Sequence, residues 1–115
     1  MHFFRAEEFL KIKTRLDDRD LHSHVKARML QRGVTKEEIE VTLNKGWEAD
    51  DAKPGTSGKV FVFPYNDNWE GEFFEEKEVR VYYKSVGDTF VLLTVKARYG
   101  KIFLREEVRE SENRI

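Results

Sequence analysis

The sequence has no cysteine among its 115 residues, and this absence excludes several kinds of chemistry. Without cysteine there is no disulfide framework, no thiolate zinc site and no cysteine nucleophile, and the composition suits a reducing compartment. The chain also lacks a long apolar run. Charged residues recur every few positions over residues 1–18, so we expect neither a signal peptide nor a membrane span, and we expect a cytoplasmic protein.

An excess of charge of one sign is also missing, because 21 Lys and Arg residues nearly balance 22 Asp and Glu residues. This balance argues against coating of nucleic acid through overall charge. The charges are nevertheless segregated along the chain. Residues 22–33 carry three cations and no acid, and residues 80–105 carry six cations and one acid. Residues 67–78 carry six acids and one lysine, which we interpret as a solvated loop.

The remaining composition predicts one folded domain over residues 1–115, with 39% hydrophobic and 13% aromatic residues for a core. Amphipathic spacing predicts an extra N-terminal helix over residues 4–16, within a segment 1–20, and a second helix over 21–31, with Asp18 or Asp20 as its N-cap. Gly33 stands where a left-handed C-cap belongs. Residues 34–46 contain a capping box, and we expect the chain after residue 105 to be a charged tail.

After Trp47 the spacing of hydrophobic residues changes from the helical period to the two-residue alternation typical of β-strands. "KVFVFPY" predicts a strand that Pro64 stops, and residues 66–78 predict a long hairpin loop or a twisted strand edge. "VRVYYKS" and "TFVLLTVKARY" predict a hairpin joined at "VGD", and "KIFL" begins like another strand. We therefore predict an α+β fold in which N-terminal helices pack on an antiparallel sheet of about four strands.

The stretch "HSHVKARMLQRG", residues 22–33, holds the main candidate site. On a helical wheel His24, Arg28 and Arg32 form a polar ridge beside the apolar stripe of Leu21, Val25 and Met29. Arginine offers a bidentate fork for phosphate, and histidine can transfer protons near neutral pH. Cleavage of RNA through its own 2′-hydroxyl needs only a base, an acid and positive charge, so this ridge could serve phosphodiester chemistry.

Strand alternation offers a second group of polar residues. Thr94, Lys96 and Arg98 share one predicted face of a strand, and Lys84 on the preceding strand can join them. Structural interpretations remain open beside the functional ones: a core histidine at position 24, arginines paired with acids of the next helix, and Trp47 and Trp69 as core residues. The three histidines lack metal-ligand spacing, so we expect no metal and no cofactor.

The run "SHVKARMLQRGVT", residues 23–35, resembles the S-x-H-A-x-x-R-M-x-x-R-G-I-S/T signature of the domain-of-unknown-function family numbered 4258. Val25 replaces the usual alanine, and Ser23 directly precedes His24. The resemblance extends to about Arg98, so residues 21–105 are the family-like core. The family is similar in plan to small toxin ribonucleases of the RelE, ParE and BrnT-like type, which implies a RelE-like fold and RNA cleavage without metal.

The leading hypothesis is a toxin-like domain that binds RNA or cleaves it without metal; whether it is an enzyme stays open. The candidate catalytic residues are His24, Arg28 and Lys96, and the candidate substrate contacts are Arg32, Lys84, Arg98 and Thr94. The alternative is a non-catalytic module whose basic helix docks an acidic partner such as an antitoxin. A homodimer that uses residues 89–95 as an edge strand is compatible with either hypothesis.

Overall fold

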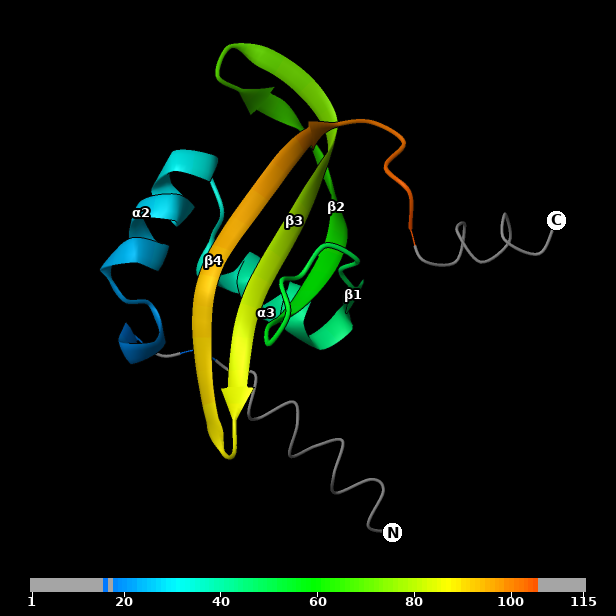
Figure 1. Ribbon diagram of the computed structural model, residues 1–115. Coiled ribbons are helices and arrows are strands. Elements are labelled where there is room, and N and C mark those ends of the chain that lie inside the picture. The colour runs from blue at the N-terminus through cyan, green and yellow to red at the C-terminus, as the bar shows by residue number, and fades with distance from the viewer. Residues whose placement is uncertain (1–15, 17, 106–115) are drawn as a thin grey trace, which may run out of the picture.

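The computed structural model describes Leu16 and residues 18–105, and it has an α+β architecture with two α-helices and one four-stranded antiparallel sheet. The strand order in the sheet follows the chain, β1-β2-β3-β4 (Figure 1). The elements are the 3₁₀ turn η1 (Asp18–Asp20), α2 (Ser23–Arg32), α3 (Lys36–Lys45), β1 (Trp47–Glu48), β2 (Ser57–Trp69), β3 (Glu72–Val86) and β4 (Thr89–Gly100). The helix predicted over residues 4–16 and the tail after residue 105 lie outside the described residues, except for Leu16.

Helix α2 forms where its apolar spacing predicts, but its N-terminus differs from the prediction. Asp18 and Asp20 belong to η1, and His22 is the N-cap, with no side-chain capping bond. The prediction of an aspartate cap was therefore wrong. Gly33 ends the helix with a left-handed φ of 69°, as its position predicts. Val25 is fully buried, so the apolar stripe of α2 faces the core.

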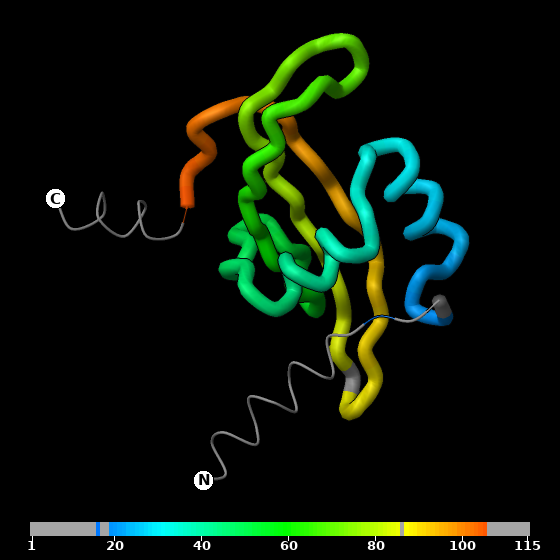
Figure 2. The backbone as a smooth tube through the Cα atoms, turned by 180° about the vertical axis from the view of Figure 1, so that it is seen from behind, coloured from blue at the N-terminus to red at the C-terminus, as the bar shows by residue number. Residues whose placement is uncertain are grey.

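Helix α3 begins with the predicted capping box. The hydroxyl of Thr35 accepts a bond from the Glu38 amide at 3.1 Å, and the Glu38 carboxylate accepts one from the Thr35 amide at 3.0 Å. Ile39 and Leu43 are buried and lie on the side of the helix that faces the sheet. Seen from behind in Figure 2, α3 lies across β2 and β3 while α2 lies along β4. Both helices therefore cover one face of the sheet.

The β2–β3 hairpin is much longer than the sequence predicts. Pro64 does not stop β2, which continues to Trp69 through a register shift between Pro64 and Asp67. A proline is tolerated there because β1 pairs only with Lys59 and Val60, which leaves this stretch of β2 on the outer edge. Of the two predictions for residues 66–78, the strand is confirmed and the solvated acidic loop was wrong, because β2 runs to Trp69 and β3 begins at Glu72.

Strands β3 and β4 form the predicted hairpin, with Gly87 and Asp88 in the turn between them. The segment after Gly100 is not the further strand that "KIFL" suggested. Ile102 has a left-handed φ of 57°, and the Phe103 amide donates to Glu76 at 2.9 Å, which folds the segment back over the sheet. The core lies between the helices and the sheet and includes Leu16, Leu21, Val25, Ile39, Leu43, Val79, Val81, Leu92 and Val95.

Candidate functional site: the α2–β4 edge and the open sheet face

The outer edge of β4 is partly covered by side chains of α2. His22 Nε2 lies 2.9 Å from the Leu92 carbonyl oxygen, and Arg32 Nη1 donates to the Val95 carbonyl at 2.6 Å. These bonds satisfy two backbone acceptors that have no neighbouring strand, because β4 ends the sheet. Arg32 is therefore fixed in place along the edge. The homodimer alternative needs this same edge to be open.

The other predicted residues of the helix ridge remain exposed or half-buried. His24 is exposed, and its ring is stacked on that of His22 with centroids 6.3 Å apart. Arg28 donates to the side-chain oxygen of Gln31 at 2.9 Å. Neither arginine of α2 is within ion-pair distance of an acid among the described residues, so pairing with α3 does not explain them. The side chains of His24 and Arg28 are accessible to a ligand.

The predicted alternation of β4 is confirmed. Val95 and Ala97 pack in the core, while Thr94, Lys96 and Arg98 lie on the face that points away from the helices. Lys96 is the cross-strand neighbour of Arg80 in β3. Lys84 pairs instead with Val91 near the end of the hairpin, about 13 Å along the strand from Arg80. The structure thus groups three of the four predicted strand residues and leaves Lys84 apart.

The structure does not bring the three predicted catalytic residues into one cavity. Lys96 lines a hollow of about 360 Å³ on the open sheet face, and α2 contributes no residue to this hollow. His24 and Arg28 belong to the helical layer on the other side of β4. A ligand can reach both groups only by lying along the edge of β4, and not by entering a single pocket.

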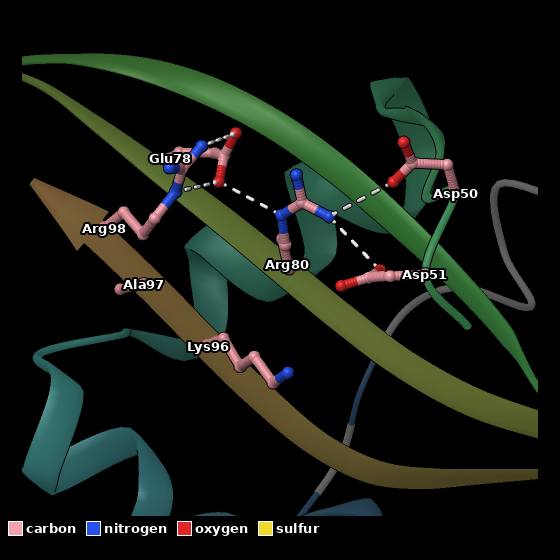
Figure 3. A pocket seen from close by; sticks show the side chains of 7 residues that line it. All are labelled: Asp50, Asp51, Glu78, Arg80, Lys96, Ala97 and Arg98. Atoms are coloured by element: carbon pink, nitrogen blue, oxygen red, sulfur yellow. Dashed lines mark hydrogen bonds and ion pairs between the residues drawn. The ribbon is translucent and has the colours of Figure 1, made fainter. Parts of the chain in front are cut away.

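The hollow contains a carboxylate that the sequence reasoning did not identify. Glu78 is 1% exposed, and Arg98 donates to its two carboxylate oxygens at 3.0 and 3.1 Å. Arg80 Nε donates to the same carboxylate at 3.0 Å (Figure 3). Burial acts to raise the pKa of Glu78, but the hydrogen bonds from Arg98 and Arg80 outweigh it and hold the pKa below its usual value. Glu78 is a fixed anion that positions both arginines.

A second carboxylate reaches the open face from the loop after β1. Asp51 accepts bonds from the Tyr82 hydroxyl at 2.8 and 3.0 Å and from Arg80 Nη1 at 3.2 Å. The bond from Tyr82 is the main cause of a lowered pKa for Asp51. The ammonium of Lys96 lies 5.2 Å from the centre of the Tyr82 ring. Glu78, Arg80 and Tyr82 alternate in "EVRVY", and pairing this pattern with "TVKAR" could have identified the cluster from sequence.

A buried lysine connects the long hairpin to the turn between the helices. Lys77 is 2% exposed, and its ammonium donates to the Glu38 carboxylate at 2.8 and 3.0 Å and to the Gly33 carbonyl. It also lies 5.5 Å from the centre of the Tyr99 ring, on which Trp69 is stacked at 4.8 Å. Trp69 is therefore a packing residue here. Burial raises the pKa of Tyr99.

Charge is distributed unevenly across the sheet. The adjoining elements α2 and β4 contain no acidic residue and contain five cations: Lys26, Arg28, Arg32, Lys96 and Arg98. At the other edge, residues 36–56, which span α3, β1 and the following loop, carry six acids and three lysines. A chain of nearly neutral net charge therefore has one basic edge, built by segments that are far apart in sequence.

Two structural features are absent from the described residues. Within residues 16 and 18–105 there is no group of three or more His, Asp or Glu side chains placed to hold a metal ion. No helix in that part of the chain is long and apolar enough to cross a membrane. Comparisons with protein-family models, with curated proteins and with solved structures find no match for this chain.

Proposed function

We propose that this chain is an RNA-binding protein and that the RNA lies along the α2–β4 edge. The observation that carries the proposal is the basic edge itself, in which two adjoining elements hold five cations and no acid. Phosphate contacts supply most of the sequence-independent affinity for nucleic acid, and they need accessible cations. Lys26, Arg28 and Lys96 have no acidic partner within ion-pair distance among the described residues, whereas Arg32 donates to the Val95 carbonyl and Arg98, although 63% exposed, is paired with Glu78.

The layout also supports a toxin-like plan of the RelE type. Two helices precede the strands and cover one face of an antiparallel sheet, as the resemblance over residues 23–98 implies. Metal-independent cleavage is the narrower form of this proposal. It would use His24 as a general acid or base beside Arg28. Lys96 faces the other side of β4, so it could contact only a different phosphate of the same RNA molecule.

The proposal is tested by the affinity for a short single-stranded RNA, measured by fluorescence anisotropy at several salt concentrations. Three phosphate contacts predict a slope of log K against log salt of about −2. Lys26→Ala is expected to weaken binding several-fold and to reduce the slope by about 0.7. Lys45→Ala is the matched control, because Lys45 is an exposed helical lysine of α3 on the acidic side. Equal losses for the two variants would contradict the proposal.

Cleavage is tested separately with the same RNA in EDTA. The cleaving form of the proposal predicts products with the wild type and a loss of about 100-fold or more in rate with His24→Ala. His22→Ala is the control for the stacked ring pair. Binding without products would restrict the function to binding alone, and unchanged cleavage by His24→Ala would remove His24 from the mechanism.

One observation favours the alternative, a module that docks an acidic protein. Leu30 is 84% exposed on the outer side of the basic helix α2. An apolar side chain contributes nothing to phosphate contacts, so binding of RNA does not explain its exposure. An acidic amphipathic helix could cover Leu30 and pair with Lys26 and Arg28. Under this alternative Leu30→Ser weakens binding of a synthetic Glu/Leu helical peptide. Under the RNA proposal the same variant leaves RNA affinity unchanged.

A further inference from the structure

The loop between β1 and β2, residues 49–56, lies against the most basic part of the open sheet face. Its Asp51 carboxylate contacts Arg80 of β3, and the Asp50 carboxylate lies 3.8 Å from the same guanidinium (Figure 3). Asp51 also accepts a hydrogen bond from the Tyr82 hydroxyl. The ammonium of Lys96 stands across the strand pair from Arg80. The positively charged and hydroxyl groups of this face therefore surround a carboxylate that the chain itself provides.

The two carboxylates bound on this face differ in how firmly they are held. Glu78 is 1% exposed and accepts three hydrogen bonds from two arginines, so its carboxylate is held firmly in place. The Asp51 side chain is 48% exposed and comes from a loop. Other hydrogen bonds of the loop stay within it, from Thr56 to Lys53, or join its first residue to β2. Because the Asp51 carboxylate is half exposed and its loop makes few hydrogen bonds to the sheet, Asp51 can be displaced from its partners.

The space around Asp51 is sufficient for a larger anion. The hollow of about 360 Å³ beside Arg80 and a second one of about 240 Å³ beside Tyr82 both include Asp51 and Lys96 in their walls. Guanidinium, ammonium and phenol groups are the usual donors to phosphate oxygens. A phosphate group can replace the Asp51 carboxylate and use the same donors.

We propose that Arg80, Tyr82 and Lys96 form a phosphate-binding site on the open sheet face, and that Asp51 occupies this site until a phosphate displaces it. The identity of the ligand rests on the proposed RNA function, whereas the site itself does not. Under that function the phosphate belongs to a nucleotide of an RNA that crosses from the α2–β4 edge onto the sheet. The loop then acts as an internal competitor, which limits binding to ligands able to displace Asp51.

The test uses Asp51→Asn in the full chain and inorganic tripolyphosphate as the probe, measured by isothermal titration calorimetry. Asparagine keeps the shape and a bond to Tyr82 but removes the competing charge, so affinity should rise about tenfold. Adding Lys96→Ala to this variant should abolish the gain. Asp50→Asn is the matched control: it makes the same change of charge one residue away, on a side chain that is 74% exposed.

The outcomes separate the competitor from a general effect of charge. A gain confined to Asp51→Asn supports the proposal. An equal gain with Asp50→Asn, or no gain with Asp51→Asn, overturns it, provided that circular dichroism shows both variants folded. If Asp51→Asn gains affinity for tripolyphosphate while neither it nor the wild type binds RNA, the phosphate site stands and the proposed RNA function fails.

Discussion

Gly33 joins the two helices, and the structure predicts that Gly33→Ala is the most disruptive small substitution in this region. The residue has a left-handed φ of 69°, and a β-carbon here would lie 2.5 Å from Cζ3 of Trp69 and 2.8 Å from the Tyr99 hydroxyl. Neither neighbour can move freely. The Trp69 ring is stacked on Tyr99, whose hydroxyl donates to the Arg32 carbonyl at 2.6 Å.

The expected loss has two parts. The left-handed conformation costs an alanine about 1 kcal/mol relative to glycine. Forcing a methyl group against packed rings costs about 2 kcal/mol more. Gly33→Ala should therefore reduce the free energy of unfolding by about 3 kcal/mol. Gly87→Ala is the matched control, since Gly87 has a φ of 60° and a β-carbon there would have no neighbour within 4 Å. Its cost should be about 1 kcal/mol.

Urea unfolding of the two variants measures both costs, with the slope m checked for two-state behaviour. In a Trp69→Leu background the cost of Gly33→Ala should fall but stay above that of Gly87→Ala, because the two contacting ring atoms of Trp69 are gone while the Tyr99 hydroxyl remains. Equal losses for Gly33→Ala and Gly87→Ala in the wild-type background would refute the packing of the hairpin against the helix turn.

Three further predictions concern stability. The folded-state pKa of Glu78 lies below its usual 4.5, so the stability it contributes is present above about pH 4.5 and is lost as pH falls through the lower folded value. Glu78→Gln should therefore cost about 3 kcal/mol of unfolding free energy near neutral pH. Urea unfolding at a series of acidic pH values should show a weaker dependence of stability on pH for this variant than for the wild type. Lys77→Met leaves the Glu38 carboxylate without its buried partner and should cost about 3 kcal/mol, whereas an unchanged urea midpoint would show that the pair is dispensable. Thr35→Ala removes half of the capping box and should lower stability by about 1 kcal/mol, and a loss that is absent in thermal unfolding would show that α3 does not depend on its cap.

Local signals predicted α2, α3 and the β3–β4 hairpin well, because each depends on contacts within a few residues. The capping box at Thr35 and the left-handed Gly33 are examples. The alternation in β4 likewise placed Thr94, Lys96 and Arg98 on one face. Pro64 misled the prediction because its effect depends on whether its strand is central or at an edge, which is a property of the whole sheet.

The composition of the site could not be predicted from a single strand or helix. The ridge on α2 and the face of β4 each appear in the sequence, but their placement on opposite sides of one edge strand follows from the packing of the helical layer. The burial of Glu78 with its two arginines and of Lys77 with Glu38 was missed because both residues lie in an acidic stretch whose average composition suggests solvent exposure. Cross-strand register places Arg98 opposite Glu78, and the packing of α3 on the sheet brings Glu38 to Lys77.

The proposed binding edge is tested most directly by titrating the isotope-labelled protein with a short single-stranded RNA and following its backbone amide signals by NMR. RNA bound along the α2–β4 edge should shift the signals of α2 and of residues 94–98 of β4, with those of residues 49–56 and 80–82 following if a phosphate displaces Asp51, and should leave those of α3 and β1 nearly unchanged. Shifts confined to α3 and β1, or no shifts at RNA concentrations that saturate the anisotropy signal, would contradict it.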